Sequence, residues 1–331
     1  MANIMRIGGG GGSKGGEVIV NTDAGATVTA TTTGTTITAV ADAEGIAELN
    51  LSKVGTWTIQ ASKDGLVGPA KIYTVPPVFT LPVATAVANL SPTSGVTYKE
   101  GLEGVTPALI HLYGEAISNN SSINNTVDSV WLDCGEESRK ISIGDTMPMT
   151  IDGNEWAVQV VSFNTDQMAD RGEYRSTVTG KCGMTLDTVL AISEARMNAD
   201  IENSGGWANT EMRNITISAM LNSIPTYWQG VMLSRKLVNT LGTTPTTDKL
   251  ALHSQEEVAL ETGANAYRLY SKGGDNGRIK KNASGQAVVW WLRDTPDKLV
   301  GAFYMISAGG GLATSFGNAI SLSGVVPSFA F

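Results

Sequence analysis

The residue types that most enzymes use for acid–base, nucleophilic or metal chemistry are scarce in this chain. It has two histidines, His111 and His253, and two cysteines, Cys134 and Cys182. These are too few for a multi-histidine metal centre or a disulfide framework. No Ser, His and Asp arrangement of a hydrolase is evident, and we expect both cysteines to be reduced and buried as small apolar residues. We therefore predict no catalytic residue, no metal and no cofactor, and expect a protein that is not an enzyme.

Carboxylates are the one type of catalytic residue that is abundant in this chain, which has 31 Asp and Glu residues. A glycosidase needs only two of them, roughly 5–9.5 Å apart. Asp166 with Asp170, or Glu256 with Glu257, could be named as such a pair. We expect these side chains to be solvated surface groups instead. A polysaccharide depolymerase stays open as an alternative function of another class.

A glycine run near the start offers a phosphate-loop pattern, since Gly10, Gly12 and Gly15 match G-x-G-x-x-G. Any glycine run contains this pattern, and the segment before it is too short for the strand of a dinucleotide-binding unit. No Gly-Lys-Ser/Thr follows it either. We expect residues 1–16 to be a flexible tail, because consecutive glycines lose much backbone entropy on ordering.

The composition of the 331-residue chain favours strands and turns over long charged helices. Charged residues make up only 16%, and glycines number 38. The formal charge of −8 argues against a nucleic-acid partner, because phosphate contacts need clustered Lys and Arg. No stretch resembles a signal peptide or a bilayer span, so we expect synthesis in a cytoplasm and no membrane insertion.

Residues 17–76 have the pattern of a small antiparallel β-sandwich, in which Trp57 fills the core between two sheets. The run Asp42-Ala-Glu-Gly-Ile-Ala-Glu-Leu49, followed by Gly55-Thr-Trp-Thr-Ile-Gln-Ala61, resembles immunoglobulin-like modules related to carboxypeptidase regulatory domains. Such modules usually act as spacers or docking units. Strands are predicted at residues 17–20, 26–31, 35–40, 46–51, 56–61 and 70–75.

Prolines end this sandwich, and residues 77–126 are predicted to be a connector or a small subdomain. Within it, residues 108–113 have the pattern of a strand that carries His111. Later, apolar residues at i, i+3 and i+4 spacing predict a helix over residues 186–197. A second helix is predicted over residues 210–222, capped by Asn209. Its inward-facing residues are expected to be Met212, Ile215, Ala219 and Met220.

Five strings follow one another in the C-terminal part of the chain: Gly205-Gly-Trp-Ala-Asn-Thr-Glu-Met-Arg213, Met220-Leu-Asn222, Leu250-Ala-Leu-His-Ser254, Trp290-Trp-Leu-Arg293 and Gly324-Val-Val-Pro-Ser-Phe329. In order and spacing they resemble the DUF6273-type domain. The resemblance covers residues 127–331 and implies a C-type-lectin-like α+β fold. Domains of this type are found in phage tail and capsid-fibre proteins and in bacterial surface proteins.

The fold class is thus expected to be multidomain, mainly β plus α+β, with an Ig-like β-sandwich before the C-type-lectin-like domain. The motif tryptophans Trp207, Trp290 and Trp291 are expected in the core. Arg213 and Arg293 could pair with Glu211, Asp294 or Asp200. Ser254 and Glu257 fit a capping box.

The resemblance does not extend to the known chemistry of better-understood relatives. The calcium-sugar triplets Glu-Pro-Asn and Gln-Pro-Asp and the tripeptide Trp-Asn-Asp are absent from the sequence. Formylglycine-generating relatives need a cysteine-based site in the C-terminal part, where this chain has no cysteine beyond Cys182. Calcium-dependent sugar binding and oxidase activity are therefore not expected.

Lectin-like folds present ligands at variable loops, which here follow Trp291. The residues of these loops are types that adaptable binding surfaces favour, and residues 309–311, all glycine, should let the loop bend. The alternative reading places the aromatic residues in the core. The candidate ligand-binding surface consists of Phe303, Tyr304, Ser307, Thr314, Ser315, Phe316, Asn318 and Ser321.

Together these features predict a phage virion structural and adhesion protein of a tail fibre, baseplate or capsid fibre. The tail and the Ig-like domain would bind other virion proteins, and the C-terminal domain would bind a host cell-surface glycan or protein without Ca²⁺. We expect a homo-oligomer, with a trimer favoured, because multivalency strengthens weak contacts. A purely structural decoration or tail protein without receptor binding is the alternative within this class.

Overall fold

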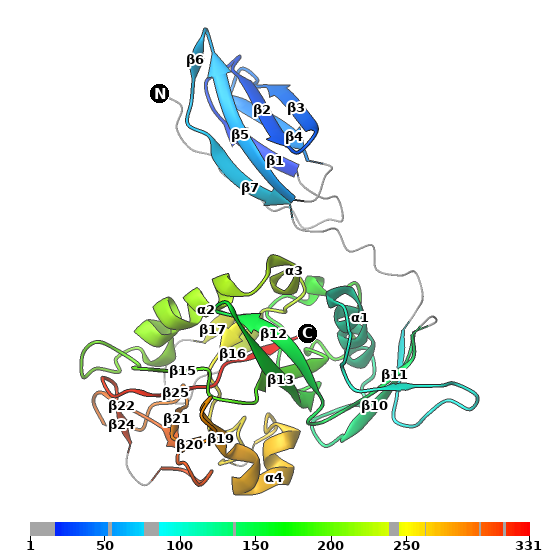
Figure 1. The fold of residues 1–331 in the computed structure, drawn as a ribbon, viewed down its shortest axis with the longest axis vertical. Coiled ribbons are helices and arrows are strands. Elements are labelled where there is room, and N and C mark those ends of the chain that lie inside the picture. The colour runs from blue at the N-terminus through cyan, green and yellow to red at the C-terminus, as the bar shows by residue number, and fades with distance from the viewer. Residues whose placement is uncertain are drawn as a thin grey trace. The chain divides into compact units, whose positions relative to one another are not determined.

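The structure is a computed structural model of the chain (Figure 1). It describes residues 17–51, 55–75, 86–134, 137–237, 245–261, 263–297, 299–313 and 316–331. The chain divides into two compact units, Met1–Thr80 and Leu81–Phe331. Strands dominate the described residues of both units, which confirms the predicted mainly β, multidomain class. Residues 86–126 belong to the second unit, together with the residues that follow them.

The first unit contains two antiparallel sheets, and every strand predicted in residues 17–76 is present. β1 pairs with β4, while β2 lies between β3 and β5, and β5 also pairs with β6 and β7. Trp57 is fully buried among Val18 and Leu49 of one sheet and Val28 of the other, as predicted. The strands are β1 (Glu17–Asn21), β2 (Thr27–Thr32), β3 (Thr35–Val40), β4 (Ile46–Asn50), β5 (Gly55–Lys63), β6 (Leu66–Val67) and β7 (Lys71–Val75).

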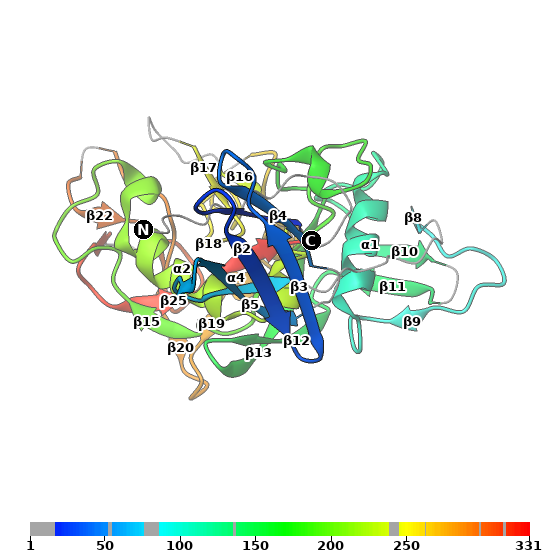
Figure 2. The ribbon, with the colours of Figure 1, turned by 90° about the horizontal axis from the view of Figure 1, so that it is seen from above.

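A five-stranded sheet forms the centre of the second unit, in the order β12-β13-β14-β26-β18. β26, the last strand of the chain, pairs with β14 and β18, so the C-terminal end lies inside this unit (Figures 1 and 2). Phe331 is fully buried. The strands are β12 (Thr146–Ile151), β13 (Asn154–Phe163), β14 (Met184–Thr188), β18 (Leu250–Ala251) and β26 (Ser328–Ala330).

The helix predicted over residues 186–197 is wrong. This segment contains strands β14 and β15 (Ser193–Ala195). All residues of β14 are buried, because the strand is interior to the sheet and covered on both faces. The helical spacing of Leu186, Val189 and Leu190 arises because these residues run across the end of β14 into the loop that follows it.

Smaller sheets surround the central one. Their strand orders are β8-β10-β11-β9 and β15-β25-β21-β23, and the pairs are β16-β17, β19-β20 and β22-β24. The strands are β8 (Val87–Asn89), β9 (Lys99–Glu100), β10 (Ser129–Asp133), β11 (Arg139–Ser142), β16 (Arg235–Leu237), β17 (Thr246–Asp248), β19 (Lys280–Lys281), β20 (Ala287–Val288), β21 (Trp290–Trp291), β22 (Ala302–Phe303), β23 (Met305–Ile306), β24 (Gly317–Asn318) and β25 (Ser323–Val325).

The strand predicted around His111 is also wrong, because the residue lies in helix α1 (Pro107–Ser118). The helix begins at a strong start signal. Thr106 caps it by accepting a hydrogen bond from the backbone N–H of Leu109 (3.3 Å), and Pro107 occupies the first turn. The other helices are α2 (Ser218–Ser223), α3 (Thr226–Gln229) and α4 (Arg268–Arg278), with short 3₁₀ turns at Arg171–Glu173 and Gly206–Asn209.

The helix predicted over residues 210–222 is present, but its first part, Met212–Ile217, is a π-helix. Thr210, and not the predicted Asn209, caps this helix. Its hydroxyl accepts a hydrogen bond from the backbone N–H of Arg213 (3.1 Å). The wider π register buries Ile217 in place of Ile215, which is 63% exposed. Ala219 is also exposed, whereas Met212 and Met220 are buried as predicted.

Helix α1 approaches the central sheet through two glycines that touch backbone to backbone. A Cβ atom at Gly183, which precedes β14, would lie 2.0 Å from the carbonyl oxygen of Gly114 in α1. A Cβ atom at Gly114 would lie 2.7 Å from the carbonyl carbon of Phe331. Side chains at either position would push the helix away from β14 and β26. These glycines therefore set the distance between helix and sheet.

Candidate functional site

The structure places most of the predicted surface residues at or near the surface, on and around β22, β23 and β24. Phe316 is 43% exposed, and Asn318 and Ser321 are exposed. Tyr304 and Ser307 are half-buried. Thr314 and Ser315 lie outside the described residues.

Phe303 does not belong to this surface, and its prediction as a surface residue is wrong. Its side chain is fully buried and packs edge-to-face on Trp291, with ring centroids 6.4 Å apart. The reason is the alternation of a strand, because neighbouring side chains point to opposite faces. Phe303 points inward, and Tyr304 after it is partly accessible.

Tyr304, which follows β22, and Phe316, which precedes β24, form an aromatic pair. Their ring centroids lie 5.1 Å apart at an interplanar angle of 73°, an edge-to-face arrangement. A hydrogen bond fixes the backbone at Tyr304, whose N–H donates to the carbonyl oxygen of Asp294 (3.0 Å). Antiparallel pairing of Phe303 with Gly317 holds the neighbouring strands together. The pair is therefore held on a firm backbone.

The chain turns at residues 309–311, where a bend was expected, since the N–H of Gly310 donates to the carbonyl of Ser307 (2.9 Å). Gly310 is held from outside the loop, since Nε of Arg278 donates to its carbonyl oxygen (2.7 Å). A Cβ atom at Gly310, whose φ is +85°, would lie 1.8 Å from the carbonyl oxygen of Asp275. The glycine thus permits a close approach to α4 and gives the loop a fixed shape.

An apolar rim beside the aromatic pair was not foreseen from the sequence. The backbone brings its parts together, since the N–H of Ala319 donates to the carbonyl of Gly301 (2.8 Å), and Gly301 lies against Ile201. Isolated apolar residues in loops give no periodic signal, so pattern analysis does not single them out. The C-terminal apolar rim consists of Ile201 (55% exposed), Leu299 (43%), Val300 (82%), Ile320 (43%) and Leu322 (67%).

The motif tryptophans Trp207, Trp290 and Trp291 are fully buried, as predicted. The motif arginines form ion pairs with carboxylates that were not among the predicted partners. Arg213 pairs with Asp248 (2.8 Å), and Arg293 pairs with Glu257 (2.6 Å). These carboxylates are 35 and 36 residues away along the chain, so proximity in sequence misled the choice.

A buried polar cluster around Asp187 joins β14, β19 and α4. Asp187 accepts hydrogen bonds from Nζ of Lys280 (2.8 Å), from Nε2 of Gln159 (3.0 Å) and from the hydroxyl of Tyr270. Nε2 of His253 lies 3.3 Å from Oδ2 of Asp187, outside hydrogen-bond geometry. Burial alone would raise the pKa of Asp187, but attraction to Lys280 and His253 outweighs burial and lowers this pKa to about 2.

Glu257 and Asp166 are two further buried carboxylates of this unit. Glu257 accepts from both terminal nitrogens of Arg293 (2.6 Å each), and Asp166 pairs with Arg235 (3.1 Å). The backbone N–H of Ser254 donates to Glu257 (2.9 Å), and the N–H of Glu257 donates back to the Ser254 hydroxyl (3.1 Å), which confirms the capping box. Burial opposes ionisation of Glu257, but attraction to Arg293 prevails and lowers its pKa.

The expectation that the named carboxylate pairs are solvated is therefore wrong for Asp166 and Glu257, whereas Asp170 is exposed. These buried ions have exposures between 0% and 6%, so they have no free surface for a substrate. Charged groups at such depth need partners, and their pairing locks strands and helices together. Their role is to stiffen the frame behind the exposed loops.

Acidification is expected to destabilise the second unit. The pKa of Asp187 is about 2 in the folded chain and about 4 in an unfolded one. Its contribution to stability is therefore complete above pH ~4 and is lost as the pH falls through ~2, by about 2 kcal/mol. Glu257 acts in the same direction. Denaturant unfolding between pH 7 and pH 2.5 measures this, and a free energy of unfolding that stays constant below pH ~4 contradicts it.

Other kinds of site find little support among the described residues. Cys134 and Cys182 are free and buried, as predicted. No group of three or more His, Cys, Asp or Glu side chains in the described part is placed to hold a metal ion. The helices described are all too short or too polar to cross a membrane.

Comparison with known proteins gives one match. Residues 179–330 match the family described as "Domain of unknown function (DUF6273)". No curated protein and no solved structure matches the chain. The match contains β14, the Asp187–Lys280 and Glu257–Arg293 pairs and the exposed loops around Tyr304. The C-terminal part of this chain is therefore similar to the DUF6273 family over these residues.

Proposed function

We propose that this chain is a virion structural and adhesion protein, and that the loops around Tyr304 bind a host cell-surface glycan or protein without Ca²⁺. One observation carries the proposal. The Tyr304–Phe316 pair and the exposed Asn318 lie on and beside the paired strands β22 and β24, and the residues of the C-terminal apolar rim are exposed on the segments that adjoin these strands or contact them. Monomeric proteins rarely gather exposed apolar residues in this way, and such patches mark interaction sites.

The chemistry of this surface suits recognition of an irregular partner. Tyrosine and phenylalanine supply large contact areas at low conformational-entropy cost, and Asn and Ser supply adaptable hydrogen bonds. The frame behind them is rigid, with Arg278 holding Gly310. A loop that is already shaped loses less entropy when it binds.

The finer fold assignments and the partners belong to the same proposal. We take the second unit to be C-type-lectin-like and the first to be an Ig-like module of the carboxypeptidase-regulatory type. Two antiparallel sheets around Trp57 support the latter. In this proposal residues 1–16 and the first unit bind other virion proteins in the particle. The chain acts as a homo-oligomer, with a trimer favoured, so that several weak contacts add up.

Staining of bacterial cells with the fluorescently labelled full chain tests this function. On a strain that the wild type stains, the double variant Tyr304→Ala/Phe316→Ala is expected to bind at least about tenfold more weakly, because both halves of the aromatic pair are lost. Tyr227→Ala is the matched control, since Tyr227 is 44% exposed on α3. It should stain like the wild type, and addition of a Ca²⁺ chelator should change neither result.

Equal staining by the double variant and the wild type would refute this surface as the attachment site. Clearing of capsular polysaccharide by the protein would point to the depolymerase instead. Staining of no strain in a broad panel would favour a purely structural role.

A further inference from the structure

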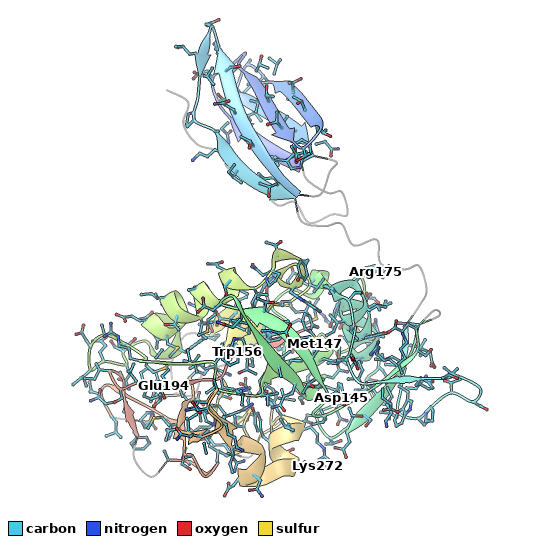
Figure 3. The ribbon with its side chains drawn as sticks, in the orientation of Figure 1. Asp145, Met147, Trp156, Arg175, Glu194 and Lys272 are labelled. Carbon is cyan, nitrogen blue, oxygen red and sulfur yellow. The ribbon has the colours of Figure 1, made fainter. Side chains whose placement is uncertain are left out.

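Trp156 is a half-exposed tryptophan that the surface around Tyr304 does not use. It lies on β13, opposite Met149 of β12, near the tight turn at Asp152 and Gly153 (Figure 3). Both turn residues have positive φ (53° and 72°), as a compact hairpin requires. The indole Nε1 donates to the carbonyl of Ile151 (3.3 Å), so the ring is anchored to its own hairpin.

A hollow of about 240 Å³ lies on one side of Trp156. Trp156 and Val288 supply apolar wall, and Ser193, Glu194 and Asn282 supply polar groups. Oδ1 of Asn282 accepts from the backbone N–H groups of residues 284 and 286 (3.0 and 3.1 Å). This bond fixes the amide and directs its Nδ2 group, which has no partner among the described residues, toward donation to a ligand.

A second hollow, of about 370 Å³, also has Trp156 in its wall. Met147, Pro148 and Ala157 are its apolar residues, and Glu103 is among its polar ones. The tryptophan thus borders two adjoining hollows on β12, β13 and β15. Each is near the lower end of the range for small-molecule pockets, roughly 300 Å³, which suits units of monosaccharide size.

The lining selects the class of ligand. A pyranose ring has a face of C–H groups, which packs on an aromatic ring, and an edge of hydroxyls, which bond to carboxylate and amide groups. The described lining contains Glu103, Glu155 and Glu194 but no Lys or Arg. Acidic sugars and phosphates would be repelled by this charge. A quaternary cation would need an aromatic cage, whereas here Trp156 is the only aromatic residue among the lining residues.

We propose that Trp156 is the platform of a binding site for neutral hexopyranose oligosaccharides, with adjoining sugar units in the two hollows. Glu194 and Asn282 bind hydroxyls in the first hollow, and Glu103 and Glu155 do so in the second. The site shares no residue with the surface around Tyr304, so it is separate from the proposed attachment function.

Saturation-transfer NMR and titration of the full chain with maltotriose, cellotriose and chitotriose test this proposal. At least one of these neutral trisaccharides is expected to bind with a dissociation constant of about 1 mM or lower. Trp156→Ala should weaken that binding at least about tenfold, and Trp156→Phe should retain most of it. Trigalacturonate, which is acidic, should bind at least about tenfold more weakly than the neutral sugar.

Trp131→Ala is the matched control, because Trp131 is also a half-buried tryptophan on a strand of the second unit, with Nζ of Lys140 5.6 Å from its ring. It should bind the trisaccharide like the wild type, and so should Tyr304→Ala/Phe316→Ala. Glu194→Gln should weaken binding without changing the far-ultraviolet circular dichroism. The proposal is overturned if none of the three sugars binds, if Trp156→Ala binds as the wild type does, or if choline binds in their place.

Discussion

Replacing Asp187 by asparagine is expected to lower the free energy of unfolding of the second unit by about 3–5 kcal/mol. The substitution keeps the size of the side chain but leaves the ammonium group of Lys280, which is 1% exposed, without its counter-charge. Removing one partner of a buried pair costs more than the pair contributes, because a bare charge stays in a low-dielectric interior. Denaturant unfolding followed by tryptophan fluorescence measures the loss.

A surface ion pair serves as the control for this prediction. Arg196 and Glu211 lie 3.5 Å apart with side chains 51% and 39% exposed, so Arg196→Met should cost less than about 1 kcal/mol. The double variant Asp187→Asn/Lys280→Met should be more stable than Asp187→Asn alone, since it removes the stranded charge. Equal stability of Asp187→Asn and the wild type would show that the cluster does not hold the frame.

Replacing Gly183 by alanine is the second change with a large expected effect, a loss of about 3 kcal/mol or more. The new methyl carbon would lie 2.0 Å from the backbone oxygen of Gly114, which no side-chain movement can relieve. Helix α1 must move away from β14, and this movement disturbs the packing of Phe331. Thermal unfolding monitored by circular dichroism measures the loss.

Gly273 in α4 is the matched control, because a Cβ atom there would meet no atom within 4 Å. Gly273→Ala should leave the stability within about 1 kcal/mol of the wild type, since the new methyl group meets no atom and the helical backbone breaks at the next residue, Gly274 (φ +54°). If Gly183→Ala and Gly273→Ala unfold at the same temperature, the close approach of α1 to the sheet is not a determinant of stability.

Local sequence patterns were sufficient to predict the strands of the first unit. Its strands are short and separated by turns, and residues such as Val28 and Ala30 alternate with exposed threonines, so each strand carries its own signal. Every predicted strand there is present, and Trp57 is in the core. Information within a few residues therefore determined the secondary structure of this unit.

The same patterns failed at two places in the second unit. Leu186 of β14 falls at helical spacing with Val189 and Leu190, but the spacing runs across the end of the strand into a loop and marks no helix. In α1, the apolar run from Ile110 to Tyr113 resembles a strand, although Thr106 and Pro107 before it carry a helix start signal. That signal could have corrected the prediction.

The candidate sites depend on contacts between distant residues, which a single sequence does not reveal. Asp187 and Lys280 are 93 residues apart, and Asp166 and Arg235 are 69 apart. Residue type alone indicated Tyr304 and Asn318, but it could not separate them from the buried Phe303. Sequence patterns did not single out Trp156, because residues 191–194 and 282–288 complete the first hollow beside it and Glu103 contributes to the second.

Hydrogen–deuterium exchange tests the proposed attachment surface most directly, because it locates a contact without altering the protein. The full chain is compared with and without the envelope polysaccharide of a strain that it stains. The proposed function predicts slower exchange in residues 303–313 and 316–322, and unchanged exchange in the first unit. Protection confined to other segments, with residues 303–322 exchanging as in the free protein, would contradict it.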